Sequence, residues 1–551
     1  MVCFSDTFKV HLEYEQRLLS KTLTFQECFI TLNQIESFIS RFPEKATQQS
    51  ITSLLTTIKS TRFDRQKQRF FLFQACCRIM ILMIRHAMLP LRQPLLSAMQ
   101  DLLVATSGAR HRAIAEALGS LPLNIKGYEF DTGTATGQTI RFDELLQTLE
   151  IESLSDMVWQ GRSLVGTTKK EKIGVIKFFR RDDRIEEITK EISWMEELKH
   201  LAFDETTDFD IPVPVRCRHC RYFEITHIPR AVLTQLDHRV ASGAGNSQYR
   251  LAIAFIAGPE YFTYPNEPVE DSKPMQINEA SRFDFEQIRG MFKNNASLLG
   301  GLASQGIIHT ALIPLFHNRA QRHRRDDGGY YLWEHGGRLD KWLESCRYPN
   351  FGASGLRDFE HLEPLEDHGR FHHYIGTHLL SFILVAGSCF RNQVPTLKGL
   401  DEKGNPADAR HLFDKTVFQN LLIAAIQTYY RTLTGVFPTG LERLISLEFI
   451  DKLIQKMGMD TDMEERLRVE DQNLMDEQMF TDFISQRLCP QDLIDPPKRG
   501  RDDITFVSGP HLGGFNQPIS VPELTDLLFT LSALCISDRY ALENGLKPLC
   551  N

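Results

Sequence analysis

The chain has 551 residues and a mass of 63.3 kDa, a length that favours about three or four domains over a single compact core. Its hydrophobic content of 42% and charged content of 24% are those of an ordinary globular protein, which excludes a largely disordered, collagen-like or coiled-coil chain. The formal net charge of −8 lacks the positive field that binding to a phosphate backbone requires, so we expect no nucleic-acid partner.

The beginning of the chain, MVCFSDTFKVHLEYEQ, carries acidic residues where a secretory signal has a positive region and then an apolar run, so no export signal is expected. The most apolar segment, HLLSFILVAGSC at residues 378–389, is shorter than the roughly 20 residues of a membrane span and predicts a buried helix. Eleven cysteines without framework spacing favour a reducing compartment. We therefore expect a cytoplasmic protein with no membrane span, and delivery into a host cell is compatible with this expectation.

The first part of the chain, residues 1–121, shows helical periodicity. Apolar residues recur three and four positions apart in segments such as LTFQECFITLNQIESFISRF and FFLFQACCRIMILMIRHAM. Pro43, Pro90 and Pro94 fall between the segments, where a missing N–H costs little. This pattern predicts an all-helical domain built as an antiparallel array.

Short β-type runs replace the helical pattern from about residue 122, where LPLNIKGYEFDTGTATGQTIRF predicts one or two hairpins. A turn-rich segment near residue 400 marks the end of this mixed region, and helical periodicity then returns, with a helix start just after Ser520. The fold class predicted is α+β. Its expected parts are a helical region at residues 1–121, a mixed region at residues 122–400 and a second helical region at residues 401–551.

The run GVIKFF places Lys177 on a strand, with Val175 and Phe179 on the same face of the sheet. A lysine among buried residues keeps its charge only if an anion pairs with it. Glu191, in the helix predicted to follow, is a suitable partner.

The segment around Lys177, MVWQGRSLVGTTKKEKIGVIKFF and the helix after it, resembles the small lobe of a protein kinase. In that family a glycine loop covers the ATP phosphates, a strand lysine binds them, and a glutamate of helix C holds the lysine. The resemblance implies that Gly161, Arg162, Gly166 and Lys177 contact the nucleotide. It also implies that Glu191, which begins EISWMEELKH, is the glutamate that pairs with the lysine.

The resemblance implies a bilobal kinase-like core, with an N-lobe at residues 122–265 and a C-lobe at residues 266–400. It extends over residues 282–318, which are similar to helix E and the catalytic loop of a kinase. The family's His-Arg-Asp is replaced by a run in which His309 keeps a structural role and Ala311 replaces the general base. The metal-binding asparagine corresponds to Asn318 if the loop is two residues longer. Glu334, in YYLWEHGG, takes the place of the metal-binding aspartate of Asp-Phe-Gly, and supplies the hard oxygen ligands that Mg²⁺ prefers.

In keeping the lysine and lacking the base, the chain resembles the bacterial pseudokinases related to the SidJ protein glutamylases. Members bind ATP in the kinase cleft and transfer AMP to a protein carboxyl group, and the acyl-adenylate is then attacked by the amine of free glutamate. This resemblance implies ATP and Mg²⁺ as cofactors and a protein acceptor as substrate. Arg319 and Arg322, in the basic segment HNRAQRHRRDDGG, are suited to the pyrophosphate, although DDGG also fits a solvated hairpin tip.

The leading hypothesis is thus a pseudokinase-fold enzyme that transfers AMP, or glutamate through AMP, to a protein. Two alternatives stay open: a non-catalytic nucleotide-binding pseudokinase that acts as an interaction scaffold, and an atypical protein kinase that uses another carboxylate, such as Asp340, as its base. An activating partner protein is a further alternative. IQTYYRTLTG carries only the first half of a calmodulin-binding IQ motif, so dependence on calmodulin is doubtful.

Overall fold

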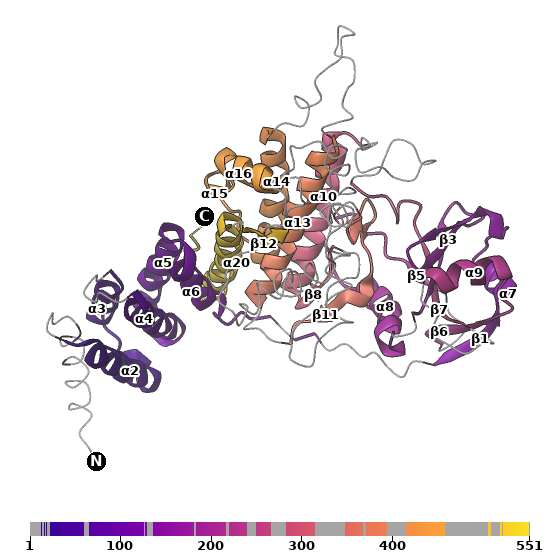
Figure 1. Cartoon of the computed structure of the whole chain (residues 1–551). Helices are drawn as coiled ribbons and strands as arrows, with labels where there is room; N and C mark the ends of the chain where they lie inside the picture. Colours follow the sequence, from indigo (N-terminus) through magenta and orange to yellow (C-terminus); the bar gives the residue numbers. More distant parts are fainter. Residues whose placement is uncertain are drawn as a thin grey trace, which may run out of the picture.

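The computed structural model combines a seven-stranded mixed sheet with two helical regions (Figure 1). The structure describes residues 13, 16, 18, 23–59, 66–125, 127–128, 136–180, 183–205, 207–215, 220–239, 250–265, 283–313, 346, 348–366, 371–393, 415–457, 505–507, 518–520 and 522–549.

The N-terminal helices lie side by side, as the apolar periodicity predicts (Figure 1). They are α2 (Phe25–Arg41), the 3₁₀ turn η1 (Pro43–Lys45), α3 (Gln48–Lys59), α4 (Gln66–His86), α5 (Leu89–Ala105) and α6 (Gly108–Gly119). A capping box between Thr24 and Glu27 begins α2. The expectation that Pro94 separates two helices is wrong, because α5 begins at Leu89 and contains Pro94 within it.

The sheet has the strand order β1-β6-β7-β4-β3-β2, and β5 pairs with β7 beside this path. Its strands are β1 (Gly137–Arg141), β2 (Met157–Gln160), β3 (Ser163–Thr167), β4 (Ile173–Phe178), β5 (Val213–Pro214), β6 (Tyr222–Thr226) and β7 (Arg250–Ala257). Neighbours are antiparallel except β1, which runs parallel to β6. The hairpin predicted after residue 122 is therefore not seen among the described residues there, which form one strand with a distant partner.

Each face of the sheet packs on different helices. Val175 and Phe179 belong to the core shared with α8 (Ile185–Glu197), whereas Ile176 and Phe178 pack in a second core under α7 (Phe142–Thr148) and α9 (Arg230–Arg239). Figure 1 shows α8 on the side of the sheet that faces the rest of the chain. The alternation predicted for the strand of Lys177 is thus confirmed. Short 3₁₀ turns η2 (Leu154–Asp156) and η3 (Leu198–His200) flank these elements.

The second half of the chain is mainly helical. Its elements are α10 (Phe285–Ser304), β8 (Ile307–His309), β9 (Phe351–Gly352), β10 (Gly355–Leu356), η4 (Phe359–His361), β11 (Leu362–Pro364), α13 (Phe371–Gln393), α14 (Lys415–Thr434), α15 (Leu441–Leu444), α16 (Leu447–Met457), β12 (Thr505–Val507), β13 (Pro518–Ser520) and α20 (Pro522–Glu543). Helix α10 packs closely along α14, because Gly300 has no side chain: a Cβ there would lie 2.7 Å from the carbonyl oxygen of Tyr429.

The apolar segment at residues 378–389 lies in α13, and its described side chains are buried, as predicted. Among the described residues, no helix combines the length and apolar character that crossing a membrane requires.

Helix α20 connects the N-terminal helices with the helices of the second half of the chain. It packs on α5 and α6 and also on α13 and α14 (Figure 1). A fully buried carboxylate, that of Asp538, lies at this junction. It accepts hydrogen bonds from Gln100 Nε2 at 2.9 Å, the backbone N–H of Leu549 at 2.9 Å and Tyr430 Oη at 2.6 Å. Three donors from separate segments therefore satisfy one buried charge.

We expect Asp538→Ala to lower the free energy of unfolding by about 3 kcal/mol, because the substitution removes the buried acceptor of hydrogen bonds from Gln100, Tyr430 and Leu549. Urea unfolding followed by circular dichroism measures this loss. The control is Asp101→Ala, at an exposed position of α5, which should change stability by less than about 0.5 kcal/mol. Equal effects of the two substitutions would contradict a structural role for the Asp538 network.

Candidate functional site

A two-residue turn, Gly161–Arg162, joins β2 to β3, because Gln160 pairs with Ser163. Gly161 has a φ of 58°, which suits the first position of a type II′ hairpin turn. Gly166, which the kinase resemblance places with Gly161 in the glycine loop, lies within β3. A Cβ on Gly166 would lie 2.9 Å from Cγ of Met157, so packing against its neighbours accounts for the glycine.

Lys177 and Glu191 come together as predicted. Lys177 Nζ donates a hydrogen bond to Glu191 Oε2 at 2.7 Å, and the two side chains are 6% and 1% exposed. Glu191 is buried because it lies on the apolar stripe of α8, next to Ile188 and Met195. The same helix is fixed to the second half of the chain by Trp194, whose Nε1 donates to the Leu362 carbonyl at 2.8 Å.

Two further carboxylates approach the same lysine from the turn after β10. Lys177 Nζ lies 3.1 Å from Asp358 Oδ1 and 3.4 Å from Glu360 Oε2. The Asp358 side chain is 31% exposed, whereas that of Glu360 is 3% exposed. Solvent therefore reaches the cluster beside Asp358.

Asp358 has a left-handed backbone with a φ of 52°, which is uncommon for a residue other than glycine. The preceding Arg357 holds this turn in place: its Nη1 donates to Tyr264 Oη at 2.5 Å and its Nη2 donates to the Pro349 carbonyl at 2.6 Å. His309 Nε2 donates to the Arg357 carbonyl at 2.8 Å. The surrounding contacts thus fix the orientation of the aspartate.

Arg162 reaches the cluster from the β2–β3 turn. Its Nη1 donates to Asp183 Oδ2 at 2.6 Å, and its Nη2 donates to both oxygens of Glu360, at 2.5 and 2.6 Å. The Arg162 side chain is 6% exposed. Glu360 is therefore shared by Arg162 and Lys177.

The pKa values of the cluster move in different directions. Burial opposes the charge of Lys177, but the attraction of Asp358, Glu191 and Glu360 outweighs burial and raises the lysine pKa. Burial would also raise the pKa of Glu360, yet Arg162 and Lys177 hold it well below its usual range. Burial raises the pKa of Glu191 to about 7 against the attraction of Lys177, and Glu191 Oε1 has no hydrogen-bond partner among the described residues.

The loop after β8 carries no ionisable group at position 311. Ala311 is buried, its N–H donates to His309 Nδ1 at 3.3 Å, and its carbonyl accepts from Asn350 Nδ2 at 2.8 Å. Burial lowers the pKa of His309 to about 3, and its two hydrogen bonds fit a neutral ring protonated on Nε2. His378 Nε2 donates to the His309 carbonyl at 2.9 Å. His309 is thus a structural residue of this loop, as expected, and it contacts the turn of Asp358.

Four residues predicted for this site, Asn318, Arg319, Arg322 and Glu334, lie outside the described residues, as does Asp340. Asp358 and Glu360 are not among the site residues expected from the sequence, which assigned the metal-binding carboxylate to Glu334. The sequence feature that could have pointed to them is the pair Asp358-Phe359, which follows the hairpin of β9 and β10 after one residue.

The half IQ motif lies in α14, where Ile426, Tyr429 and Tyr430 are buried. Its apolar side chains therefore belong to the core, which does not favour calmodulin binding through this segment.

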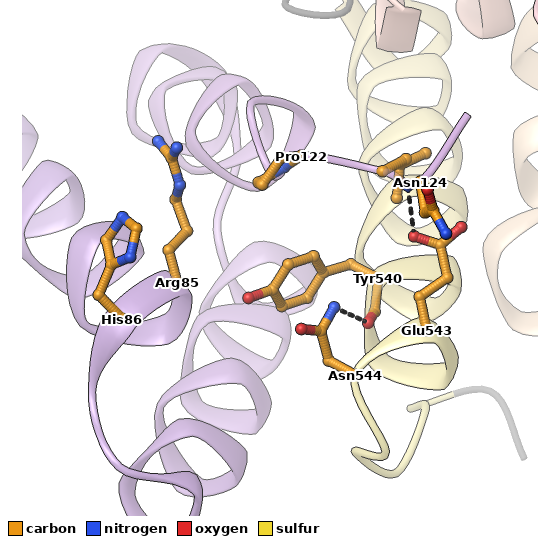
Figure 2. A pocket seen from close by; sticks show the side chains of 8 residues that line it. Arg85, His86, Pro122, Asn124, Tyr540, Glu543 and Asn544 are labelled. Carbon is orange, nitrogen blue, oxygen red and sulfur yellow. Dashed lines mark hydrogen bonds between the residues drawn. The ribbon is translucent and has the colours of Figure 1, made fainter. Parts of the chain in front are cut away.

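A pocket of about 370 Å³ lies elsewhere, between the end of α4, residues 122–124 and the end of α20 (Figure 2). The backbone N–H of Asn124 donates to Glu543 at 2.7 Å across this junction, and Figure 2 shows Arg85 and His86 on the α4 side. None of the lining residues belongs to the cluster around Lys177.

Comparison of the chain with protein-family models and with curated proteins finds no match. The residues around Lys177 are therefore the basis for assigning a function.

We expect Lys177→Met to destabilise the protein by about 3 kcal/mol, because it leaves Glu191 and Glu360 buried with less compensating charge. Lys190→Met is the matched control on α8, since Lys190 pairs with Glu363 at 2.5 Å and the Glu363 side chain is 43% exposed. That substitution should cost about 1 kcal/mol or less. Urea unfolding of both variants measures the difference, and equal costs would argue against a buried cluster.

The raised pKa of Glu191 predicts a dependence of stability on pH. The folded protein holds this proton more tightly than the unfolded chain, whose glutamates titrate near about 4.3. The stability of the wild type relative to Glu191→Gln should therefore fall between about pH 4.5 and 7, by up to about 1.4 kcal/mol per pH unit, and then level off. Urea titrations at several pH values measure it, with Glu186→Gln, an exposed residue of α8, as the reference for removing a charge. A constant difference across this range would show that Glu191 titrates normally.

Proposed function

We propose that the chain has a protein-kinase-like fold, binds ATP with Mg²⁺ beside Lys177, and transfers AMP to a protein acceptor. The observation that carries this proposal is the contact of one buried lysine with both Glu191, at 2.7 Å, and Asp358, at 3.1 Å. In protein kinases a lysine–glutamate pair and the aspartate of Asp-Phe-Gly form the corresponding arrangement.

The order of these groups along the chain supports the kinase-like fold. A glycine turn between two antiparallel strands is followed by the strand of Lys177, the helix of Glu191, the loop of His309 and the turn of Asp358. This is the order of the kinase signature motifs. The register supports it too, because Lys177 pairs with Ser163, which directly follows the glycine turn.

The cluster suits a nucleotide that brings its own metal. Mg²⁺ is commonly held by one or two protein carboxylates together with the phosphates of its substrate. Asp358 supplies such a carboxylate at the solvent-accessible side of the cluster. Within the described ranges no group of three or more metal-binding side chains is found. Asn318 and Glu334 remain candidates for further ligands.

Ala311 favours AMP transfer over phosphorylation of a hydroxyl. A kinase uses the aspartate at this position to accept the proton of the hydroxyl, and a buried methyl group offers no such base. An ionised carboxyl group of an acceptor protein needs no base: its oxygen attacks the α-phosphorus of ATP, the bond to the bridging oxygen breaks, and pyrophosphate leaves. The amine of glutamate then attacks the adenylated carboxyl carbon and gives up a proton to water, the bond from this carbon to the AMP oxygen breaks, and an isopeptide bond forms as AMP leaves. Arg319 and Arg322 are candidates to stabilise the pyrophosphate.

A non-catalytic role as an interaction scaffold is the second candidate. The observation that favours it is that both cations of the cluster, Lys177 and Arg162, are already paired with carboxylates of the chain. The atypical-kinase alternative is less favoured, because the residue at the position of the kinase base is the buried Ala311.

We expect ATP labelled at the α-phosphate to label an acceptor protein in a lysate, and ATP labelled at the γ-phosphate to leave it unlabelled. Asp358→Asn should reduce labelling by about 100-fold, because it removes a charge that holds the metal on the phosphates. Asp208→Asn, an exposed change, is the control.

Labelling only from the γ-phosphate would show a kinase instead. Binding of ATP without labelling from either position would favour the scaffold. Absence of ATP binding by calorimetry would contradict the nucleotide site.

A further inference from the structure

We infer that Glu360 is an internal competitor of the nucleotide: its carboxylate occupies the two cations that the phosphates would bind, and it must leave them before a nucleotide is held. This inference rests on the proposed nucleotide site and concerns its regulation.

Glu360 binds the two cations closely. Both of its oxygens accept hydrogen bonds from Arg162 Nη2, at 2.5 and 2.6 Å, and Oε2 lies 3.4 Å from Lys177 Nζ. Arginine and lysine bind phosphate through the same charge-assisted donors that they offer to a carboxylate. A phosphate group and the Glu360 carboxylate therefore compete for one set of donors.

Burial prevents a phosphate from binding these cations while Glu360 holds them. The side chains of Arg162, Lys177 and Glu360 are 6%, 6% and 3% exposed, so an incoming phosphate cannot reach the cations while the contacts are in place. Arg162 is the contact that must open, because it belongs to the two-residue turn of the β2–β3 hairpin, whereas Lys177 lies within β4, between β3 and β7. Release of Arg162 from Glu360 would free this turn to cover a ligand.

The position of Glu360 strengthens the inference. It is the third residue of the turn Asp358-Phe359-Glu360, where protein kinases have the glycine of Asp-Phe-Gly. A glycine at this position has no carboxylate with which to bind Lys177 or Arg162. The substitution of this one position thus accounts for the occupied cations.

Removal of the Glu360 charge leaves both cations paired. Arg162 keeps Asp183 at 2.6 Å, and Lys177 keeps Glu191 at 2.7 Å and Asp358 at 3.1 Å. Glu360→Gln is therefore expected to fold, and it tests the competition without creating an unpaired buried cation.

The experiment is isothermal titration calorimetry of the full chain with MgATP and, separately, with inorganic tripolyphosphate, for the wild type, Glu360→Gln, Glu360→Asp and Glu363→Gln. Glu363→Gln is the matched control, since Glu363 pairs with Lys190 of α8 and not with the cluster. We expect Glu360→Gln to bind both ligands about tenfold more tightly than the wild type, because the fraction of molecules able to bind rises. Glu360→Asp, with a shorter reach to Arg162, should lie between the two, and Glu363→Gln should match the wild type. Should Glu360→Gln fail to fold, an affinity of Glu360→Asp above that of the wild type supports the inference.

The outcomes separate this inference from the proposed function. Equal affinities of the wild type and Glu360→Gln would overturn the competition and leave the nucleotide site intact. Weaker binding by Glu360→Gln would also overturn it, because Glu360 would then help to hold the ligand. Failure of every variant to bind either ligand would overturn the nucleotide site together with the inference.

Discussion

A positive charge buried among carboxylates is the interaction on which the candidate site depends. Lys177 could not remain charged in the core alone, and its carboxylate partners come from two segments, α8 and the turn after β10. Arg162 of the β2–β3 hairpin shares one of these carboxylates, that of Glu360. The carboxylates are not equivalent. The pKa of Glu360 lies well below its usual range, so its charge is firmly kept, whereas the pKa of Glu191 is about 7. Near neutral pH, the net charge of the cluster therefore changes chiefly with the protonation of Glu191.

The contact of Lys177 with Glu191, which is close in sequence, was predicted from the sequence. The contacts with Asp358 and Glu360, which are distant in sequence, were not. Alternation in GVIKFF showed that Lys177 points to a buried face, and the apolar stripe of the following helix pointed to Glu191. Asp358 lies 181 residues from Lys177 along the chain, and neither periodicity nor spacing predicts a contact at that separation. The expectation placed a metal-binding carboxylate at Glu334, although the Asp358-Phe359 pair also follows a short β-type run. Gly166 shows a related limit of local patterns: a glycine occurs at tight packing inside a strand as well as in a turn, and only the register distinguishes the two.

The fold shows the same contrast: helices were predicted from local spacing, whereas pairing between distant strands was not. Helical periodicity predicted the helices before residue 122 and α13, because three- and four-residue spacing is a local property. The parallel pairing of β1 with β6 was not predicted, since Thr139 and its partner Glu224 are 85 residues apart. Pro94 was taken as a boundary although α5 accommodates it, which shows that one residue is a weak marker where the surrounding turns are well packed.

The place of α20 has a consequence for synthesis of the protein. The helices α5 and α6 pack on the last long helix of the chain, and Gln100 bonds with Asp538, 438 residues later. A ribosome makes the first helices long before it makes their partner, so the apolar surface that α20 covers stays open during most of translation. Nascent chains of this protein should therefore need protection by chaperones until α20 has been made, and loss of α20 should expose apolar surface of α5, α6, α13 and α14 together.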